Sequence, residues 1–425
     1  MIQSFHKIKK VKGSLSFRGD KSISHRALLI SSLADGKSVI KNLSESDDIK
    51  STINCLNDLG IDIENNSAEC IVNGRGFKGY QKPLNQLNAG NSGTTARLLS
   101  GILTAQNFES SIIGDESLSS RPMKRVVEPL SKMNANIVSA NGNLPINIIP
   151  VQNLQPIRYT LPMPSAQVKS AILFTGLHLD DETSVIESSQ TRNHTENLLG
   201  LKILKEENKT VSLVSKNNYP EAQEYFIPGD ISSAMFFIVL ALLTENSELL
   251  IKDISLNATR IECLKIFKRM GGEIQIEERG ISNNEIYGNV LVHSSELKNV
   301  LIEKSIIPLI IDEIPILTVA GIFAEGVFEI RGASELRVKE SDRIKAICKN
   351  LLKLGLMVEE YEDGFSDSGT INKTSKPFES FGDHRIAMSL AILSSLLESG
   401  GKVEGFESAD ISNPNFIDQL KSIAC

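Results

Sequence analysis

The chain has 425 residues, of which 41% are hydrophobic and 23% are charged, and its formal net charge is −7 at pH 7. This length suffices for two or three domains with sizeable cores, and the composition is that of a globular protein. The negative balance, without a basic stripe, argues against nucleic acid as a partner. Five scattered cysteines without a Cys-x-x-Cys pair favour free thiols in a reducing compartment.

Neither membrane insertion nor export is expected from the sequence. The most apolar run, residues 234–243, is too short to cross a bilayer, and the N-terminus lacks the apolar stretch of a signal peptide. We therefore expect a soluble protein of the cytoplasm that does not bind membranes.

One local pattern recurs along the chain: a glycine or proline, a capping Asp or Ser, nearby cations, and then an apolar helix. Its clearest copy is Gly-Asp-Lys-Ser-Ile-Ser-His-Arg at residues 19–26, which runs into Ala-Leu-Leu-Ile. Six copies lie roughly 65 to 82 residues apart, as in an internal repeat. Helix N-termini bind anions through free N–H groups and the helix dipole, so the pattern predicts a site for a multiply anionic small molecule. The copies begin at Gly19, Gly90, Pro164, Gly229, Ile311 (the weakest) and Gly382.

A second recurring motif is a helix that ends near Leu-Gly and leads into an alternating strand. The first repeat reads as strand 7–17, the template helix, strand 38–43, helix 47–59 and strand 61–64. Alternating strands and helices in six such units predict an α/β fold, most economically with three units in each of two domains. The chain is expected to cross between domains at 220–228, while the strand before Gly19 fits either domain. Further copies of the motif lie at 133–137, 199–204, 270–276 and 354–359.

The sequence predicts neither a dinucleotide-binding motif nor a structural metal site. Gly74–Gly79 matches G-x-G-x-x-G, but Tyr-Gln-Lys-Pro follows it instead of an apolar helix, so we interpret it as a surface turn. The six histidines show no metal-ligand spacing among themselves or with cysteine, so no structural metal is expected.

Several charged residues are candidates for chemistry. If 337–343 opens a helix, Lys339 and Arg343 share one face and Glu340 can pair with Arg343; otherwise the run is a solvated face with ordinary ion pairs. Asp312, at the edge of an apolar segment, is a helix N-cap, a general base, or both. The cations of 121–125 mark a Pro-initiated helix start or a basic turn. Gly93 would let an anion approach the backbone.

At these residues the sequence resembles the 5-enolpyruvylshikimate-3-phosphate synthases (3-phosphoshikimate 1-carboxyvinyltransferases) of the enolpyruvyl transferase family. The matching stretches occur in the family's order and span most of the chain. They are residues 20–27, 90–97, 120–123, 165–171, 337–343 and 382–385.

The resemblance implies a fold and a reaction. Each of two domains would hold three repeated βαβαββ units around a core of helices, an inside-out α/β barrel. The N-terminal domain would comprise 20–228 and the C-terminal domain 1–19 plus 229–425, with the active site in the cleft between them. By addition–elimination with domain closure, the enolpyruvyl group of phosphoenolpyruvate would pass to the 5-hydroxyl of shikimate 3-phosphate, without metal or cofactor, in a monomer on the route to chorismate.

The resemblance also implies residue roles. The catalytic residues would be Asp312 as the base for the 5-hydroxyl, with Glu340 and Lys21 handling the proton at the enol carbon. The shikimate 3-phosphate ligands would be Lys21, Ser22, Arg26, Ser165, Ala166, Gln167, Arg192, Asp312 and Lys339. The phosphoenolpyruvate ligands would be Lys21, Gly93, Arg121, Gln167, Arg343 and Arg385.

Some positions depart from the family pattern, and two rival functions remain. Many relatives carry serine at Ala166, tyrosine at His194 and asparagine at Glu335. Many also carry a lysine in the stretch that here begins with Ile411, and the absence of that lysine removes one expected phosphoenolpyruvate contact. The first rival transfers enolpyruvyl to UDP-N-acetylglucosamine and uses a loop cysteine, but no cysteine lies in 111–122. The second rival, a non-catalytic phosphometabolite-binding protein, would have no need of Asp312 and Glu340.

Overall fold

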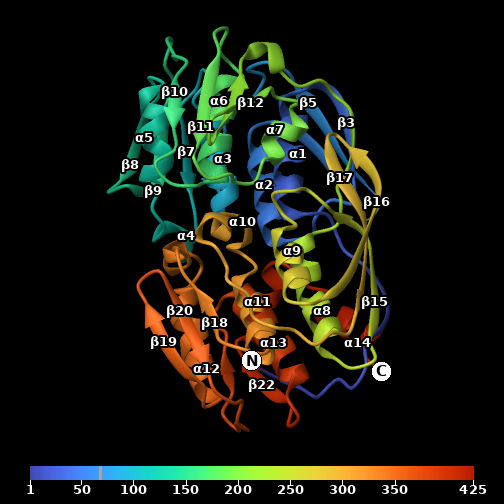
Figure 1. Ribbon diagram of the computed structural model, residues 1–425. Helices are drawn as coiled ribbons and strands as arrows, with labels where there is room; N and C mark the ends of the chain where they lie inside the picture. Colours follow the sequence, from blue (N-terminus) through green and yellow to red (C-terminus); the bar gives the residue numbers. More distant parts are fainter. Residues whose placement is uncertain (67–68) are drawn as a thin grey trace. The chain divides into compact units, whose positions relative to one another are not determined.

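Figure 1 shows the computed structural model, which describes residues 1–66 and 69–425. These residues form two compact units. The N unit comprises Arg18–Pro228 and Ile281–Glu285, and the C unit comprises Met1–Phe17, Gly229–Gly280 and Ile286–Cys425. The division differs from the expected boundaries at residues 18–19 and 281–285, which group with the N unit. The difference at 281–285 is the larger one. Hydrogen bonds explain the difference, since Asn283 Nδ2 donates to Gln223 Oε1 (2.9 Å) and Asn197 Nδ2 donates to Glu285 Oε1 (3.2 Å).

The N unit repeats one sheet topology three times. Its sheets have the orders β14-β3-β5-β4, β6-β7-β9-β8 and β10-β11-β13-β12, and in each the first pair is parallel and the next two are antiparallel. The helices are α1 (Lys21–Leu33), α2 (Asp47–Asp58), α3 (Gly93–Leu103), α4 (Glu116–Ser119), α5 (Lys124–Lys132), α6 (Ala166–Gly176) and α7 (His194–Leu198). The strands are β3 (Asp35–Lys41), β4 (Asp62–Asn65), β5 (Glu69–Arg75), β6 (Leu87–Asn88), β7 (Ser110–Ile113), β8 (Asn136–Ala140), β9 (Asn143–Ile149), β10 (Arg158–Thr160), β11 (Thr183–Glu187), β12 (Ile203–Glu206), β13 (Lys209–Val214) and β14 (Glu224–Phe226).

The C unit follows the same plan with two reduced repeats. Its sheets have the orders β16-β17-β15-β2, β18-β20-β19 and β1-β22-β21; in the second repeat the parallel edge strand shrinks to a single Lys298–Glu325 bridge. The helices are α8 (Ile231–Leu243), α9 (Glu262–Arg269), α10 (Ile307–Ile310), α11 (Ile314–Phe323), α12 (Arg343–Lys353), α13 (His384–Leu396) and α14 (Phe416–Ile423). The strands are β1 (Ile2–Phe5), β2 (Lys12–Ser16), β15 (Glu248–Ser255), β16 (Glu273–Ser282), β17 (Glu285–His293), β18 (Phe328–Ile330), β19 (Met357–Tyr361), β20 (Gly364–Ser368), β21 (Phe378–Glu379) and β22 (Gly401–Glu404).

The two units exchange the strands at their junctions. β2 directly precedes α1 along the chain, yet it pairs in parallel with β15, from Lys12 opposite Glu248 to Ser16 opposite Lys252. β14 directly precedes α8, yet it pairs in parallel with β3, Glu224 lying opposite Val39. The strand that the sequence could assign to either half therefore belongs to the C unit.

Three buried helices fill the centre of each unit: α1, α3 and α6 in the N unit, and α8, α11 and α13 in the C unit (Figure 1). Leu28, Leu99 and Ile172 on the first three are at most 1% exposed. Each sheet lays its apolar face on these helices and so buries the alternate side chains of its strands. The six repeated motifs therefore mark the starts of the six central helices of the fold.

Five of these six helices begin with the side-chain cap that the sequence predicts. Asp20 Oδ1 accepts a hydrogen bond from the Ile23 amide (3.0 Å), and Asp383 Oδ1 accepts one from the Arg385 amide (2.8 Å). These caps satisfy amides that would otherwise lack partners at the helix start. The other three caps are Ser92, Ser165 and Asp230.

The structure decides between two pairs of alternatives that the sequence left open. α11 begins just after Asp312, but Glu313 rather than Asp312 occupies its cap position, and the Glu313 side chain makes no capping bond. The run 337–343 does not open a helix, because a 3-10 turn covers Ser334–Val338 and α12 begins only at Arg343, capped by Asp342. The expected pair of Glu340 with Arg343 is present (2.6 Å), and Arg343 also pairs with Asp312 and Asp383 from other segments.

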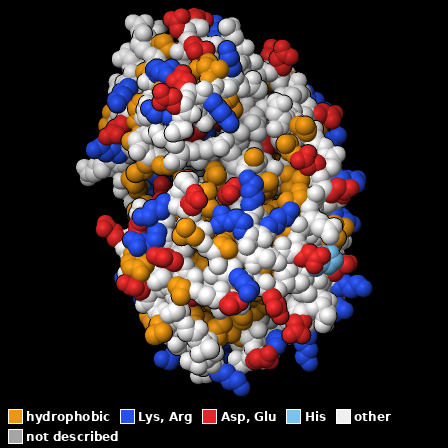
Figure 2. All heavy atoms as spheres, viewed as in Figure 1, with side chains coloured by type: hydrophobic (Ala, Val, Ile, Leu, Met, Phe, Trp, Pro, Cys, Tyr) orange, Lys and Arg blue, Asp and Glu red, His pale blue; other side chains and the backbone are white. Residues whose placement is uncertain are grey.

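No single helix within residues 1–66 and 69–425 is long and apolar enough to cross a membrane. Acidic and basic side chains are interspersed over the face of the molecule that Figure 2 shows.

Asp367 is a buried carboxyl group in β20, opposite Phe328 of β18 and Val358 of β19. The residue is 5% exposed, and burial raises the pKa of its carboxyl group from 3.8 to about 7. The folded state therefore holds its proton more tightly than the unfolded state, so the contribution of Asp367 to stability falls as pH rises from about 4 to 7.

Asp367→Asn is expected to stabilise the protein increasingly as pH rises. Relative to wild type, the gain in unfolding free energy should grow by ~2–3 kcal/mol between pH 5 and pH 8, because the variant has no charge to bury. Urea unfolding at both pH values measures it, with the exposed Asp418→Asn as the control. An identical stability difference at pH 5 and pH 8 would refute a raised pKa at Asp367.

Candidate active site

The N unit gathers predicted site residues at the first turns of its three central helices. Lys21 and Ser22 begin α1, Gly93 begins α3, and Ala166 and Gln167 begin α6. Each first turn presents free amides and the positive end of a helix dipole, which favour a bound anion. The prediction that these repeats are capped helix starts is therefore confirmed for these three helices.

Gln167 is held in place from α3. Its Oε1 accepts a hydrogen bond from Arg97 Nη1 (2.8 Å), and its Nε2 donates to Thr94 Oγ1 (2.9 Å). Arg97 was not among the predicted site residues, although it ends the second copy of the repeated pattern. Ser165 Oγ accepts from the Val168 amide (3.4 Å), which leaves the hydroxyl proton available to donate.

Arg26 and Arg192 form a pair of cations beside Ser22. Arg26 is 2% exposed; its Nε donates to Thr195 Oγ1 (2.7 Å) and its Nη2 to Ser170 Oγ (2.9 Å). Arg192 Nη1 donates to Ser22 Oγ (3.2 Å). Burial, and next the charge of Arg192, lower the pKa of Arg26 to about 10, so it stays protonated at pH 7. Such a pair suits a phosphate, whose oxygens accept from guanidinium forks.

Lys21 is anchored by a partner that the sequence did not suggest. Its Nζ lies 2.8 Å from Asp48 Oδ2 at the start of α2, and both side chains are partly exposed. Between Lys21 and Arg26, His25 is fully buried with Nδ1 2.7 Å from Thr52 Oγ1, and burial lowers its pKa to about 3. His25 is therefore neutral and adds no charge to the site.

Arg121 lies just before α5, and Pro122 precedes the cap residue of that helix. Arg121 Nη2 donates to Asn91 Oδ1 (2.6 Å), in the loop before α3, and to Ser117 Oγ (3.1 Å) on α4. The side chain is thus tied to the loop that leads to Gly93, which supports its assignment to the same ligand.

In the C unit, Asp312 lies at the corner between α10 and α11. The segments 304–310 and 314–323 meet at a bend of 115°. Asp312 Oδ1 lies 3.3 Å from Arg343 Nη1 and 3.9 Å from Lys339 Nζ, and its side chain is 15% exposed. Asp312 is therefore a partly exposed carboxylate between two cations rather than a helix cap.

Arg343 is the centre of the C-unit group. Its side chain is 1% exposed, and it also contacts Asp383 Oδ2 (Nε, 2.8 Å) and Glu340 Oε2 (Nη2, 2.6 Å). Burial alone would lower the pKa of Arg343, but the charges of Asp383, Glu340 and Asp312 outweigh it and raise the pKa above the ordinary value. Arg343 thus holds two predicted catalytic carboxylates together.

Arg385 is 6% exposed in the first turn of α13, where its amide donates to Asp383. Within the described part of the chain, its guanidinium makes no hydrogen bond or ion pair, so it can receive an anion. Asp383 was missed as a site residue. Its second role, as the carboxylate partner of Arg343, depends on tertiary packing that no local motif signals.

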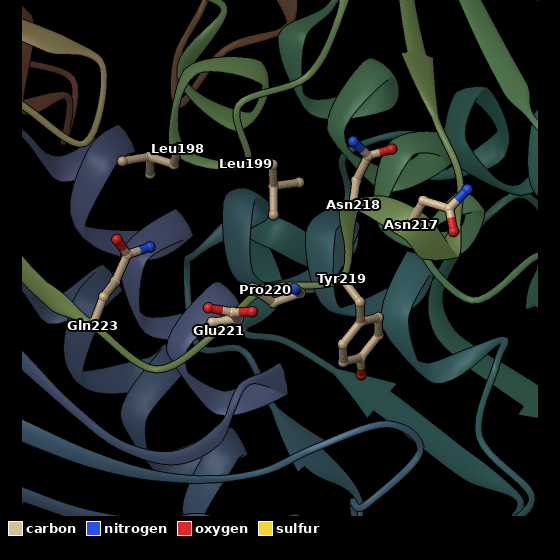
Figure 3. Close-up of a pocket in the computed structure, with 8 residues that line it drawn as sticks. All are labelled: Leu198, Leu199, Asn217, Asn218, Tyr219, Pro220, Glu221 and Gln223. Carbon is tan, nitrogen blue, oxygen red and sulfur yellow. The ribbon is translucent and has the colours of Figure 1, made fainter.

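The predicted site residues thus form two groups, one in each unit. A separate cavity of about 240 Å³ lies in the N unit and contains none of them. In Figure 3, Asn217 and Asn218 lie at one side of it and Gln223 at the other. Its lining residues are Leu198, Leu199, Asn217, Asn218, Tyr219, Pro220, Glu221 and Gln223.

Gly93→Ala is expected to weaken phosphoenolpyruvate binding without unfolding the protein. The added Cβ would lie 2.6 Å from Arg97 Nη1, so the flexible guanidinium would shift and release Gln167. We expect KM for phosphoenolpyruvate to rise about tenfold while kcat changes less, as when ground-state binding is lost. Steady-state kinetics measure both; Arg97→Lys should reproduce the change in KM, and an unchanged KM in Gly93→Ala would contradict the assignment.

The comparisons with known proteins find similarity over nearly the whole chain. A family model described as EPSP synthase (3-phosphoshikimate 1-carboxyvinyltransferase) matches residues 5–420. A 3-phosphoshikimate 1-carboxyvinyltransferase of Petrotoga mobilis is 47% identical over 420 residues, with 97% of each chain covered. One of Syntrophomonas wolfei is 43% identical over 428 residues, with 98% of each chain covered.

Solved structures agree as well. EPSP synthase from Acinetobacter baumannii matches with a TM-score of 0.86 at 37% identity, covering 100% of this chain and 98% of that chain. The enolpyruvyl transferase NikO from Streptomyces tendae matches with a TM-score of 0.73 at 13% identity, which bears on the fold alone; 99% of this chain and 97% of that chain are covered. The fold is therefore that of the enolpyruvyl transferases. Within that class, the chain belongs to the EPSP synthase family.

Proposed function

We propose that this chain transfers the enolpyruvyl group of phosphoenolpyruvate to the 5-hydroxyl of shikimate 3-phosphate and releases phosphate. The observation that carries the proposal is the pairing of two kinds of site. In the N unit, Arg26 and Arg192 lie beside Ser22, and in the C unit a partly exposed carboxylate, Asp312, lies beside Lys339 and Arg343. The first group suits the phosphate of a phosphorylated alcohol, and the second suits proton transfer in a reaction with an anionic enol phosphate.

The proposed addition step divides proton transfer between two groups. Asp312 accepts the proton of the 5-hydroxyl while that oxygen attacks C2 of phosphoenolpyruvate, and Glu340, with Lys21, supplies a proton to the methylene carbon. The tetrahedral adduct then loses phosphate from C2 and returns a proton from the new methyl group to Glu340, which forms the carbon–carbon double bond of the enol ether product. Because these residues belong to different units, the proposal requires both units to act on one bound pair of substrates.

The remaining ligands follow from the same proposal. Ser22, Ser165, Gln167 and Lys339, with the first turn of α6 at Ala166, bind shikimate 3-phosphate. Gly93, Arg121, Gln167, Arg343 and Arg385, together with Lys21, bind phosphoenolpyruvate. The four buried cysteine thiols fit a reducing compartment, so we also propose that the protein acts in the cytoplasm, as a monomer.

Phosphate release by the purified protein tests the proposal, with shikimate 3-phosphate and UDP-N-acetylglucosamine offered in parallel as acceptors for phosphoenolpyruvate. We expect release with shikimate 3-phosphate alone. Release only with the nucleotide sugar would replace the proposed acceptor. Tight binding of shikimate 3-phosphate without release would indicate a binding protein instead of an enzyme.

A further inference from the structure

A buried ion triad lies in the N unit and has no part in the proposed mechanism. Lys169 Nζ lies 2.6 Å from Glu187 Oε2 and 2.7 Å from Glu196 Oε1, and all three side chains are at most 2% exposed. Burial alone would lower the pKa of Lys169, but the charges of Glu196 and Glu187 raise it, so the lysine stays protonated. A buried triad of this kind contributes little net stability compared with apolar residues of similar size. Its presence therefore calls for another explanation.

The triad joins α6, which carries the proposed ligands Ala166 and Gln167, to the two elements on either side of Arg192. Lys169 is on α6, four residues after Ser165; Glu187 ends β11; and Glu196 is on α7. α6, β11 and α7 are labelled in Figure 1. Two further hydrogen bonds reinforce the triad, since the Thr191 hydroxyl donates to Glu187 Oε1 and the Ser212 hydroxyl donates to Glu196 Oε1 (3.2 Å).

The segment between the two glutamates contains the groups that meet the phosphate in the proposed function. Arg192 donates to Ser22 Oγ, and Thr195 Oγ1 accepts from Arg26 Nε (2.7 Å). Both ends of this segment, 187 and 196, are fixed to the same ammonium group on α6. Movement of either end would displace Arg192 or remove the support of Arg26.

We propose that Lys169, Glu187 and Glu196 are positioning residues that fix Arg192 and Arg26 for the phosphate group of shikimate 3-phosphate. This inference rests on the proposed function for the identity of the ligand. The triad does not touch the substrate; it acts by holding segment 187–196 against α6. Its loss should therefore weaken the binding of the phosphorylated alcohol and leave phosphoenolpyruvate binding nearly unchanged.

Charge and position predict opposite results when the whole triad is neutralised. The triad carries one positive and two negative charges, so the variant K169M/E187Q/E196Q loses one net negative charge near two arginines. Electrostatics alone would then strengthen anion binding. Loss of position would weaken it. The single variant K169M is a poor test, because it leaves two buried carboxylates without their cation and is prone to unfold.

The experiment compares wild type, the triple variant and the control Lys202→Met, an exposed lysine of the same unit. Thermal unfolding first establishes that the triple variant is folded. We expect KM for shikimate 3-phosphate to rise about tenfold or more, with kcat and KM for phosphoenolpyruvate within about threefold of wild type. An unchanged or lower KM for shikimate 3-phosphate, or an equal rise for both substrates, would overturn the proposal.

Calorimetric titration with inorganic phosphate separates this inference from the proposed function. An inactive wild-type protein would refute the proposed reaction, whatever the triad does. Weaker binding of inorganic phosphate to the folded triple variant than to wild type would still support the positioning role. Equal binding by the two proteins would refute it.

Discussion

Asp312→Asn is expected to lower kcat by about two to four orders of magnitude, the usual contribution of a general base. Asparagine has nearly the same shape and can still accept hydrogen bonds from Arg343 and Lys339, but it cannot take a proton from the 5-hydroxyl. Arg343 also keeps its contacts with Asp383 and Glu340, so the fold should survive. Steady-state kinetics with saturating shikimate 3-phosphate and phosphoenolpyruvate measure the loss.

The matched control for this prediction is Glu303→Gln, which neutralises an exposed carboxylate in the same unit and should leave kcat unchanged. A kcat of Asp312→Asn within threefold of wild type would refute its role as the base.

Arg343→Met is expected to destabilise the C unit by ~3–5 kcal/mol, because it leaves Asp383 buried without its cation. Asp383 is 0% exposed and also caps α13, one of the three central helices. Asp312 and Glu340 would lose the group that holds them together, so activity should disappear as well. Urea unfolding measures the first effect and phosphate release the second.

Two companion variants give this prediction its controls. Arg331→Met removes an ion pair with Asp363 (2.9 Å) whose arginine is 39% exposed, so it should cost less than ~1 kcal/mol. Arg343→Lys keeps the charge but loses the planar fork that contacts several carboxylates at once, and should recover only part of the stability. An equal loss in Arg343→Met and Arg331→Met would show that the buried network has no special role.

Much of the fold follows from local chemistry in the sequence. Caps such as Asp20 and Ser92 act within three residues of themselves, and the apolar run after each cap has only a buried centre to occupy. Strand exchange was not predictable in the same way. β2 pairs with β15, which lies more than 200 residues away along the chain, and no local sequence pattern indicates that pairing.

The site shows the same limit. Lys21, Arg26 and Gln167 were predicted from the family resemblance, at positions inside the repeated helix starts. Arg97 and Asp383 lie in such stretches too, but their contacts with Gln167 and Arg343, like the contact of Asp48 with Lys21, are tertiary. Whether 337–343 opens a helix could not be decided from the sequence for a related reason, because Arg343 in this run also pairs with Asp312 and Asp383 from other segments. The members of the buried triad on β11 and α7 stand alone in the sequence, and only the packing of these elements against α6 reveals their partner.

The exchange of β2 and β14 also orders the assembly of the protein during synthesis. Apart from 281–285, every element of the N unit has been made once residue 228 leaves the ribosome, including β14 for its first sheet. Segment 1–17 is translated before its partner strands β15 and β22, which begin only at residues 248 and 401. β2 therefore has no partner strand until residue 248 has been made and β1 has none until residue 401 has been made, so the C unit is completed after the N unit.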